Sequence, residues 1–411
     1  MNNFTSAIGI ALAYLREKKL SAALNVLLLA LGVGTIIALL LILHQAETRM
    51  SRDAAGIDLV IGAKGSPMQL VLSSVFQVDI PTGNVPIAEA SLIISEPAVK
   101  LAIPLALGDS YRGFRIVGTN PAYITLYNGA VASGRLWDKP LEAVLGADAA
   151  RATGLTIGKT FAGAHGLTDT GGGSAHHEQP YTVVGILAPT GSVLDRLIVT
   201  SVSSVWKLHD HAPGKAHDKH ADHASHSDDE GREVTAYLVQ YATPLAAVSF
   251  PRFVNASSSM QAASPAMESA RLFQLLGVGM NALKGFAAIM LVCAALGIFV
   301  GLMNALDERR ADLALLRVLG APPGMVVVVT LAQGLIVGLL GVILGLLLGH
   351  AGAEWIGQTY AESQRVAIGG RIWLIEECWI ALGALGLTLA AAMIPAWRAY
   401  VDATPELLAS H

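Results

Sequence analysis

The apolar residues of this chain gather in four long runs that hold no Asp, Glu, Lys or Arg. The runs cover residues 22–43, 285–306, 325–348 and 378–396. A helix needs about 20 mainly apolar residues to cross the hydrocarbon core of a bilayer. The pattern therefore predicts four transmembrane helices rather than the buried helices of a soluble protein.

Between the first two runs the pattern changes to short apolar segments bounded by turn residues. Such segments predict strands, here at residues 57–61, 98–107, 114–119, 142–145, 181–187, 197–200 and 234–240. Ser66 and Pro67 suit the cap and first residue of a helix over 68–76, and residues 147–153 predict a short helix that ends at Gly154. We therefore expect a polytopic α-helical membrane protein with a large α+β extracytoplasmic domain between its first and second spans.

The predicted organisation is an amphipathic lead, four spans and the segments between them. It comprises a cytoplasmic lead (1–21), the first span (22–43), the α+β domain (44–272), a stalk with the second span (273–306), a cytoplasmic helix (307–324), the third span (325–348), a short extracytoplasmic loop (349–377), the fourth span (378–396) and a cytoplasmic tail (397–411). Ile8, Leu12 and Leu15 recur at helical spacing in the lead, which we expect to lie against the inner membrane surface. Residues 262–283 continue helically into the second span, which predicts a stiff link.

Basic residues flank the spans unevenly, which sets the predicted orientation. Arg16, Lys18 and Lys19 precede the first span, and three arginines lie between the second and third spans. Because Lys and Arg concentrate in short cytoplasmic loops, we expect both termini in the cytoplasm and the α+β domain outside it. The first run is longer than the roughly 7–15 residue core of a signal peptide and lacks a small-x-small cleavage site, so we interpret it as a retained anchor.

Composition agrees with a membrane protein whose outer domain folds without disulfides. Of 411 residues, 53% are hydrophobic and 14% are charged, against about 25% charged in soluble chains. The two cysteines, Cys293 and Cys378, lie in or beside predicted spans. The outer domain must therefore depend on its own apolar core, although its compartment would permit disulfides.

The segment after the second span has the pattern of a short amphipathic helix. Leu313, Leu316 and Leu319 share one face, and the charged side chains lie largely elsewhere. Gly320 and the prolines that follow it end the helix. Such a helix suits docking into a groove of another protein, although the same pattern also fits a loop helix that rests on the membrane.

This segment resembles the signature of the FtsX/MacB-type ABC permeases, which reads close to R-R-x-E-I-A-L-L-R-A-L-G-A. Asp312 stands where the family usually has Glu, and Leu313 where it has Ile. Further similar motifs occur in the family's order: Gly134-Arg135, residues 142–146, Gly154 to Gly158, residues 181–187 with Gly191 and Asp195, residues 395–399 and residues 405–408. The resemblance covers nearly the whole chain.

The resemblance implies a non-catalytic half-transporter of the bacterial inner membrane, with its large domain in the periplasm. Two copies, most simply a homodimer, would pair with two copies of an ABC ATPase that carries ATP and Mg²⁺. The ATPase would grip the cytoplasmic helix and drive the outer domains by mechanotransmission. The residues expected to couple the two subunits are Asp307, Glu308, Arg309, Arg310, Asp312, Leu313, Leu316, Arg317, Leu319 and Gly320.

The chain shows no catalytic motif of its own. Residues 154–160 are one residue short of G-x-x-x-x-G-K-[ST] and lie in the predicted outer domain, so we interpret them as a strand turn. No nucleophile elbow, zinc-protease helix or paired-carboxylate motif occurs. Some twenty residues precede the first span, so we expect a separate partner to supply the ATPase. We expect no nucleic-acid partner.

Glycines spaced four apart mark the second and third spans. Such spacing lets helix backbones approach closely, which would serve packing within one subunit or a contact between two copies, and we favour the first. The glycines concerned are Gly297, Gly301, Gly334, Gly338, Gly341, Gly345 and Gly349.

A histidine-rich tract interrupts the outer domain at residues 209–230. Imidazoles interleaved with carboxylates suit Zn²⁺, Ni²⁺ or Cu²⁺, but the irregular spacing specifies no single tetrahedral site, and a solvated low-complexity insertion is the alternative. The candidate ligands are His209, His211, His217, His220, His223 and His226, with a second patch at His165, His176 and His177. We expect no other cofactor bound by this chain.

Three functions fit the sequence. The histidine tract favours a permease acting in a zinc or other divalent-metal context, with a periplasmic metal-binding protein as a further partner. A lipoprotein-releasing permease and a module that regulates a periplasmic enzyme or sensor without transport are the alternatives. A metal importer is disfavoured because the spans contain almost no ionisable side chains to line a polar path. The substrate and the direction of movement do not follow from the sequence.

Overall fold

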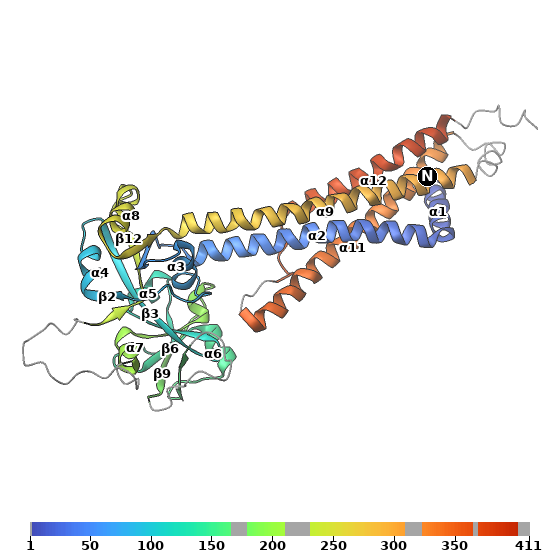
Figure 1. Ribbon diagram of the computed structural model, residues 1–411. Helices are drawn as coiled ribbons and strands as arrows, with labels where there is room; N and C mark the ends of the chain where they lie inside the picture. Colours follow the sequence, from blue (N-terminus) through green and yellow to red (C-terminus); the bar gives the residue numbers. More distant parts are fainter. Residues whose placement is uncertain (1, 166–178, 210–230, 309–322, 365–368, 402–411) are drawn as a thin grey trace, which may run out of the picture. The chain divides into compact units, whose positions relative to one another are not determined.

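A computed structural model describes residues 2–165, 179–209, 231–308, 323–364 and 369–401 of the chain (Figure 1). The chain divides into two compact units. We call residues 1–46 with 276–411 the membrane unit and residues 47–275 the sheet unit.

Long helices build the membrane unit. Within the described residues, four helices are long and apolar enough to cross a membrane, as the sequence predicted. The helices of this unit are α1 (Asn2–Glu17), α2 (Lys19–Asp53), α9 (Pro265–Glu308), α11 (Pro323–Gln364) and α12 (Ile375–Val401). At 1.5 Å per residue, the 35 residues of α2 and the 44 of α9 extend about 50 and 65 Å. Both helices are therefore much longer than the roughly 30 Å hydrocarbon core of a bilayer.

Two segments of the membrane unit, residues 349–377 and the N-terminal lead, differ from the sequence prediction. The segment 349–377, expected to be a short loop, begins as a continuation of α11 to Gln364, because no Gly-Pro stop follows the third apolar run. The lead forms α1 as expected, and one side of it packs on α11, whereas Leu12 of the predicted apolar face is exposed. Ala11 is fully buried and belongs to a cluster with Val329 of α11.

One mixed sheet organises the other unit (Figure 1). Among the described residues it has eleven strands, in the order β13-β1-β12-β3-β4-β10-β6-β9-β5, with β7 on β9 and β8 on β3. The strands are β1 (Leu59–Ala63), β3 (Val99–Tyr111), β4 (Phe114–Thr119), β5 (Val131–Gly134), β6 (Glu142–Leu145), β7 (Thr160–Phe161), β8 (Ala164–His165), β9 (Tyr181–Leu187), β10 (Ile198–Ser201), β12 (Ala236–Tyr241) and β13 (Met260–Ala263). A separate pair joins β2 (Val85–Pro86) and β11 (Glu233–Val234). Two pairings are parallel, β4 with β10 and β6 with β9.

Both faces of the sheet are buried, which explains why its central strands are mainly apolar. Alternate residues of a strand point to opposite faces, so Val60 joins one core while Leu59 and Ile61 join another. The first core packs against α3 (Pro67–Ser74) and α5 (Ala122–Leu126), and the second against α4 (Ile87–Ile94) and α8 (Ala246–Ser257). A third core lies around α6 (Ala147–Thr153).

Local signals set several elements as predicted. The Ser66 hydroxyl accepts the Gln69 N–H at 3.4 Å and Pro67 opens α3. Gly154 ends α6 in the left-handed conformation, with φ of 68°, which a residue without Cβ adopts at no steric cost. The expected continuous helix from residue 262 was wrong at its start. Residues 260–263 form β13 instead, because ladder pairing with β1 outweighs the helix preference of Met and Ala.

Candidate coupling sites

α2 enters the sheet unit through a buried acidic residue at its last position. Asp53 is 5% exposed, and its backbone carbonyl accepts the hydroxyl of Tyr127 at 2.9 Å. Its carboxylate accepts the N–H of Val193 at 2.6 Å and the Arg196 guanidinium at 3.2 Å. Because a buried carboxylate is costly without such partners, these contacts fix the end of α2 to the core of the sheet unit.

A tight loop before the short 3₁₀ helix η1 (Val193–Arg196) adds a second attachment for α2. Arg52 donates to the carbonyl of Gly191 at 2.9 Å. Gly191 has φ of +70°, and a Cβ there would lie 2.9 Å from the Arg52 guanidinium nitrogen. The Asp195 carboxylate accepts the N–H groups of Thr190 at 2.8 Å and Gly191 at 2.7 Å. Gly191 thus allows the approach of Arg52, and Asp195 holds the loop closed.

α9 leaves the sheet unit directly from a strand. Ser264 alone separates Ala263, the last residue of β13, from Pro265, the first residue of α9. β13 pairs with β1, which begins shortly after α2 ends, and Val60 stands opposite Ala263. The strands nearest the two long helices are therefore hydrogen-bonded to each other.

Glu89 of α4 secures the turn that leads into β13. Its carboxylate accepts the N–H of Ser259 at 3.0 Å and the hydroxyl of the same residue at 2.7 Å. These hydrogen bonds hold the pKa of Glu89 below its usual value. The turn before β13 is therefore held by an ionised carboxylate at neutral pH.

The Gly134-Arg135 turn closes on the strand that follows it. Arg135 donates both terminal nitrogens to the Glu142 carboxylate at 2.6 and 2.8 Å, and the same carboxylate accepts the Asp138 N–H at 2.8 Å. The hydrogen bond from Arg135 lowers the pKa of Glu142 to about 2. Gly134 has φ of +79°, and a Cβ there would collide with the Val184 carbonyl. The Glu142 carboxylate thus holds the Gly134-Arg135 turn against strand β6.

The predicted ATPase-coupling residues lie partly within the described structure. Asp307 and Glu308 are the last two residues of α9. Glu308 forms an ion pair with Lys18, at the turn between α1 and α2. The others lie outside the described residues: Arg309, Arg310, Asp312, Leu313, Leu316, Arg317, Leu319 and Gly320.

All seven glycines expected at helix contacts lie against a neighbouring helix of the same membrane unit. A Cβ at Gly345 would lie 2.7 Å from Val33 of α2, and one at Gly349 would lie 2.8 Å from Ile37. The others would bring a Cβ against α2 or α12, at Gly297 (facing Asn25), Gly301 (Ser21), Gly334 (Ala392), Gly338 (Thr388) and Gly341 (Leu29). These contacts favour packing within one chain over a contact between copies.

The histidine tract falls almost entirely outside the described residues. His209 ends α7 (Val202–His209), and His165 lies in β8 opposite Asp109. The remaining candidates lie outside: His176, His177, His211, His217, His220, His223 and His226. Among the residues that the structure does describe, no group of three or more His, Cys, Asp or Glu side chains could hold a metal ion. The metal site therefore stays a prediction from the sequence.

Two polar groupings were not foreseen in the sequence. The Asp53 cluster joins residues 140 and 143 positions apart, so no local spacing reveals it. In the membrane unit His350 bridges the Gly370 carbonyl at 2.6 Å and the Glu377 carboxylate at 2.9 Å. Glu377 is only 2% exposed, so this pair ties α11 to α12.

The near match to a phosphate-binding loop is a turn, as predicted. Gly154 caps α6, Gly158 has φ of +85°, and Thr160 begins strand β7. A nucleotide-binding loop of this kind needs a helix to follow it. A strand follows here instead, so the turn offers no helix N-terminus to a phosphate.

Two sequence families match this architecture. Residues 22–270 match the MacB-like periplasmic core domain, and residues 284–401 match the FtsX-like permease C-terminal domain. The chain belongs to the FtsX/MacB-type permeases. The family predicted from the sequence motifs is therefore confirmed. The chain matches no curated protein.

Solved structures similar to this permease are periplasmic or extracellular regions. One is the periplasmic region of MacB from Actinobacillus actinomycetemcomitans, with 12% identity, a TM-score of 0.35 and coverage of 54% of this chain and 95% of that one. Another is the extracellular domain of the noncanonic ABC-type transporter YknZ from Gram-positive bacteria, with 14% identity, a TM-score of 0.30 and coverage of 50% and 98%. Because both TM-scores are low, the assignment rests on the family matches.

Membership of the family makes this permease a membrane subunit of an ABC transporter and implies an ABC ATPase as its partner. Its membrane-capable helices and MacB-like domain fit a multi-pass inner-membrane protein with a periplasmic domain. The family also indicates a non-catalytic subunit.

Proposed function

We propose that this permease converts ATP-driven movement of a separate ATPase into movement of its sheet unit. The observation that carries the proposal is the junction of both long helices with one strand pair. α9 continues from β13 through a single residue, and the end of α2 is fixed by Asp53 shortly before β1. One residue separates β13 from α9, and five residues separate the anchored end of α2 from β1.

The assembly that we propose contains two copies of this chain and two ATPase subunits. Each ATPase grips residues 307–320, the segment predicted to be amphipathic that begins with the last two residues of α9. The ATPase binds ATP and Mg²⁺ itself. The unequal distribution of Lys and Arg supports a cytoplasmic position for this segment and a periplasmic position for the sheet unit. ATP binding then displaces the cytoplasmic end of α9, and β13 receives the displacement.

Substitution of one leucine tests this coupling. Leu316→Asp places a charge on the apolar face of the segment and should abolish co-purification of the ATPase, because a buried unpaired carboxylate costs several kcal/mol. Ala314→Asp adds the same charge about 160° away around an ideal helix and should leave the complex intact. An intact complex with Leu316→Asp refutes the assigned contact, as does equal loss with both variants.

We further propose that the histidine tract binds a divalent metal such as Zn²⁺ in the periplasm, where it is sensed or handed over. The tract's composition supports this, with six histidines and several carboxylates between residues 209 and 230. Deleting residues 213–230 should reduce Zn²⁺ binding measured by calorimetry on the full chain. Replacing the six histidines with Gln, which preserves length and charge, should have the same effect. Unchanged affinity in both variants would exclude a metal role for the tract.

A further inference from the structure

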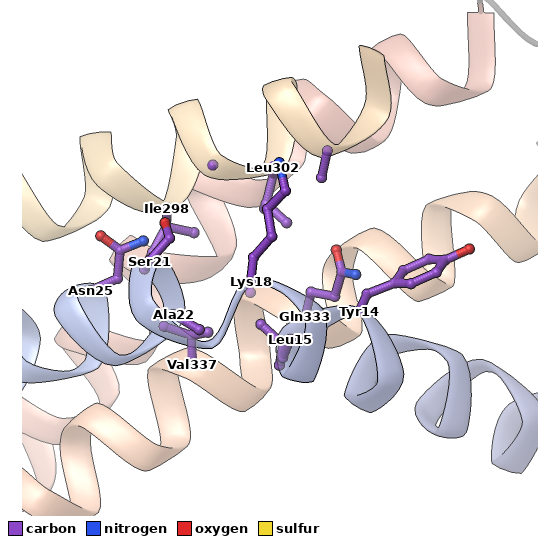
Figure 2. A pocket seen from close by; sticks show the side chains of 13 residues that line it. Tyr14, Leu15, Lys18, Ser21, Ala22, Asn25, Ile298, Leu302, Gln333 and Val337 are labelled. Atoms are coloured by element: carbon purple, nitrogen blue, oxygen red, sulfur yellow. The ribbon is translucent and has the colours of Figure 1, made fainter. Parts of the chain in front are cut away.

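Two pairs of ionisable side chains that link parts of the membrane unit differ in their exposure to water. Lys18 lines a small pocket where α1, α2, α9 and α11 meet (Figure 2), and its partner Glu308 is exposed. His350 of α11 meets Glu377 of α12, and these two side chains are only 13% and 2% exposed. Water screens the first pair but is largely excluded from the second. The groups around the second pair therefore decide which protons it holds.

Both ring nitrogens of His350 face hydrogen-bond acceptors. Nδ1 lies 2.6 Å from the carbonyl oxygen of Gly370, and Nε2 lies 2.9 Å from Oε2 of Glu377. Because a carbonyl oxygen can only accept, Nδ1 must carry a proton. The contact between Nε2 and Oε2 then needs a second proton, held by the ring as an imidazolium or by Glu377 as a carboxylic acid. In both cases the pair binds one proton more than a neutral imidazole beside an ionised carboxylate.

Neighbouring groups favour the imidazolium and the carboxylate. Oε1 of Glu377 accepts the N–H of Leu374 at 3.0 Å, and such a hydrogen bond favours the ionised acid. The ring of Trp373 lies against the imidazole of His350, with the two ring centroids 4.3 Å apart and the planes 34° apart. The face of an aromatic ring attracts a cation. We therefore place the second proton on His350.

The segment of residues 369–374 is fitted closely against α11 and α2. A Cβ at Gly370 would collide with the backbone carbonyl of His350. Oε2 of Glu354 accepts the Gly370 N–H at 2.8 Å. Gln45 of α2 donates to the Gly369 carbonyl at 2.8 Å and accepts the Gly369 N–H at 2.9 Å. A side chain at position 370 would therefore push the segment away from His350.

Other ionisable groups on these elements leave the pair to itself. Glu354 bonds to Gly370 and is attracted by Arg371, whereas His44 of α2 and Glu376 of α12 are exposed. Among the described residues, none of these four forms a hydrogen bond or ion pair with His350 or Glu377. The proton between the imidazole and the carboxylate therefore decides whether this contact holds.

We propose that His350 and Glu377 form a proton-binding site that locks residues 369–374 to α11 and releases them when the proton passes to water. Without that proton, the lone pair of Nε2 faces the carboxylate. A shift of the remaining ring proton to Nε2 moves the conflict to the Gly370 carbonyl, so one of the two bonds must break. In the orientation expected from the basic residues, the proton comes from the periplasm. The site depends on neither the ATPase nor the metal proposed above.

Electron paramagnetic resonance of one nitroxide label tests the lock in the detergent-purified full-length chain. The label is attached at Ile372→Cys with Cys293 and Cys378 replaced by Ser, and we call this chain the parent. Ile372 is 45% exposed and takes no part in the bonds described above. We expect an immobile label at about pH 5 and a mobile fraction that rises about threefold toward about pH 10, with the slope of a single proton.

Glu377→Gln should reverse this pH dependence. The amide N–H of the new side chain donates to an unprotonated Nε2, while its oxygen still accepts from Leu374, so a neutral ring now holds the segment. The label should be immobile at high pH and become mobile as the pH falls. Glu376→Gln changes the exposed neighbour, and this matched control should titrate as the parent does.

Gly370→Ala tests the lock without changing a titratable group. Its Cβ separates the segment from His350, so the label should be mobile at every pH. Because Glu377→Gln keeps the shape of the side chain, it remains informative if Gly370→Ala fails to fold. Three results would overturn the proposal: constant mobility of the parent label across the pH range, the same pH dependence in Glu377→Gln as in the parent, or an immobile label in folded Gly370→Ala.

Discussion

In this permease, single residues hold the end of helix α2, the loop before η1 and the Gly134-Arg135 turn in place. Asp53 ends α2 inside the sheet unit, Gly191 lets Arg52 reach the chain beside η1, and Glu142 closes the Gly134-Arg135 turn. Each acts on partners distant in sequence or on a backbone conformation that only glycine adopts freely. The motif pattern located Gly191 but not its partner Arg52, because no spacing encodes a contact between residues 139 positions apart. It located both Arg135 and Glu142 without showing that they pair.

The Arg135–Glu142 ion pair gives a pH-dependent contribution to stability. The folded pKa of Glu142 is about 2, below its ordinary value of 4.5. The contribution is therefore complete above pH 4.5 and is lost as the pH falls from 4.5 toward 2. Glu142→Gln should lower the free energy of unfolding at pH 7 by about 1 kcal/mol, since the pair is partly exposed. It should also flatten the fall in melting temperature between pH 5 and about pH 3.

Thermal unfolding of the detergent-purified chain measures both effects. Asp148→Asn, which breaks the exposed pair with Arg151, is the control and should change the melting temperature little. A steep acid dependence that persists in Glu142→Gln would assign it to other carboxylates.

Helices and strands with a strong apolar or alternating sequence pattern were predicted. Strands that form only because a neighbouring strand pairs with them were not. The four apolar runs and strands such as β4, β6 and β9 follow directly from composition and alternation. β5, with the sequence Val-Ala-Ser-Gly, is exposed throughout and carries no apolar pattern. The Met and Ala residues of β13 favour a helix, and this segment forms a strand because it pairs with β1.

Packing between α2 and α11 should depend on glycine at defined turns of α11. A Cβ at Gly345 would lie 2.7 Å from Val33, whereas one at Gly352 of the same helix would meet no atom within 4 Å. Gly345→Ala should therefore destabilise the chain by about 1–3 kcal/mol through overpacking. Gly352→Ala should be neutral or slightly stabilising, because Ala is the better helix former.

The melting temperatures of both variants in detergent, with their oligomeric state by light scattering, separate the two roles considered for these glycines. Loss of stability without loss of oligomer supports packing within the chain. Dissociation at unchanged stability would place Gly345 at a contact between copies instead.

At the scale of the whole molecule, this permease joins a membrane unit and a sheet unit through two long helices. Both helices exceed the thickness of a bilayer, and both meet the strand pair β1–β13. Sequence predicted the helical connection but not the sheet edge that receives it, since strand order is set by long-range pairing. The proposed transmission therefore depends on a junction that only the fold reveals.

That junction gives the last prediction. Two glycines inserted after Ser264 should uncouple the sheet unit from α9, because a flexible joint replaces the single residue between β13 and the helix. ATP hydrolysis by the reconstituted complex should continue, since the inserted residues lie far along α9 from Glu308. A distance between the two sheet units, measured by spin labels at Ser95→Cys with Cys293 and Cys378 replaced by Ser, should lose its ATP-dependent change. The same insertion after Gly172 is the control and should preserve that change. If the ATP-dependent change survives the insertion at Ser264, the force reaches the sheet unit by another route, and α2 with its Asp53 anchor becomes the element to cut next.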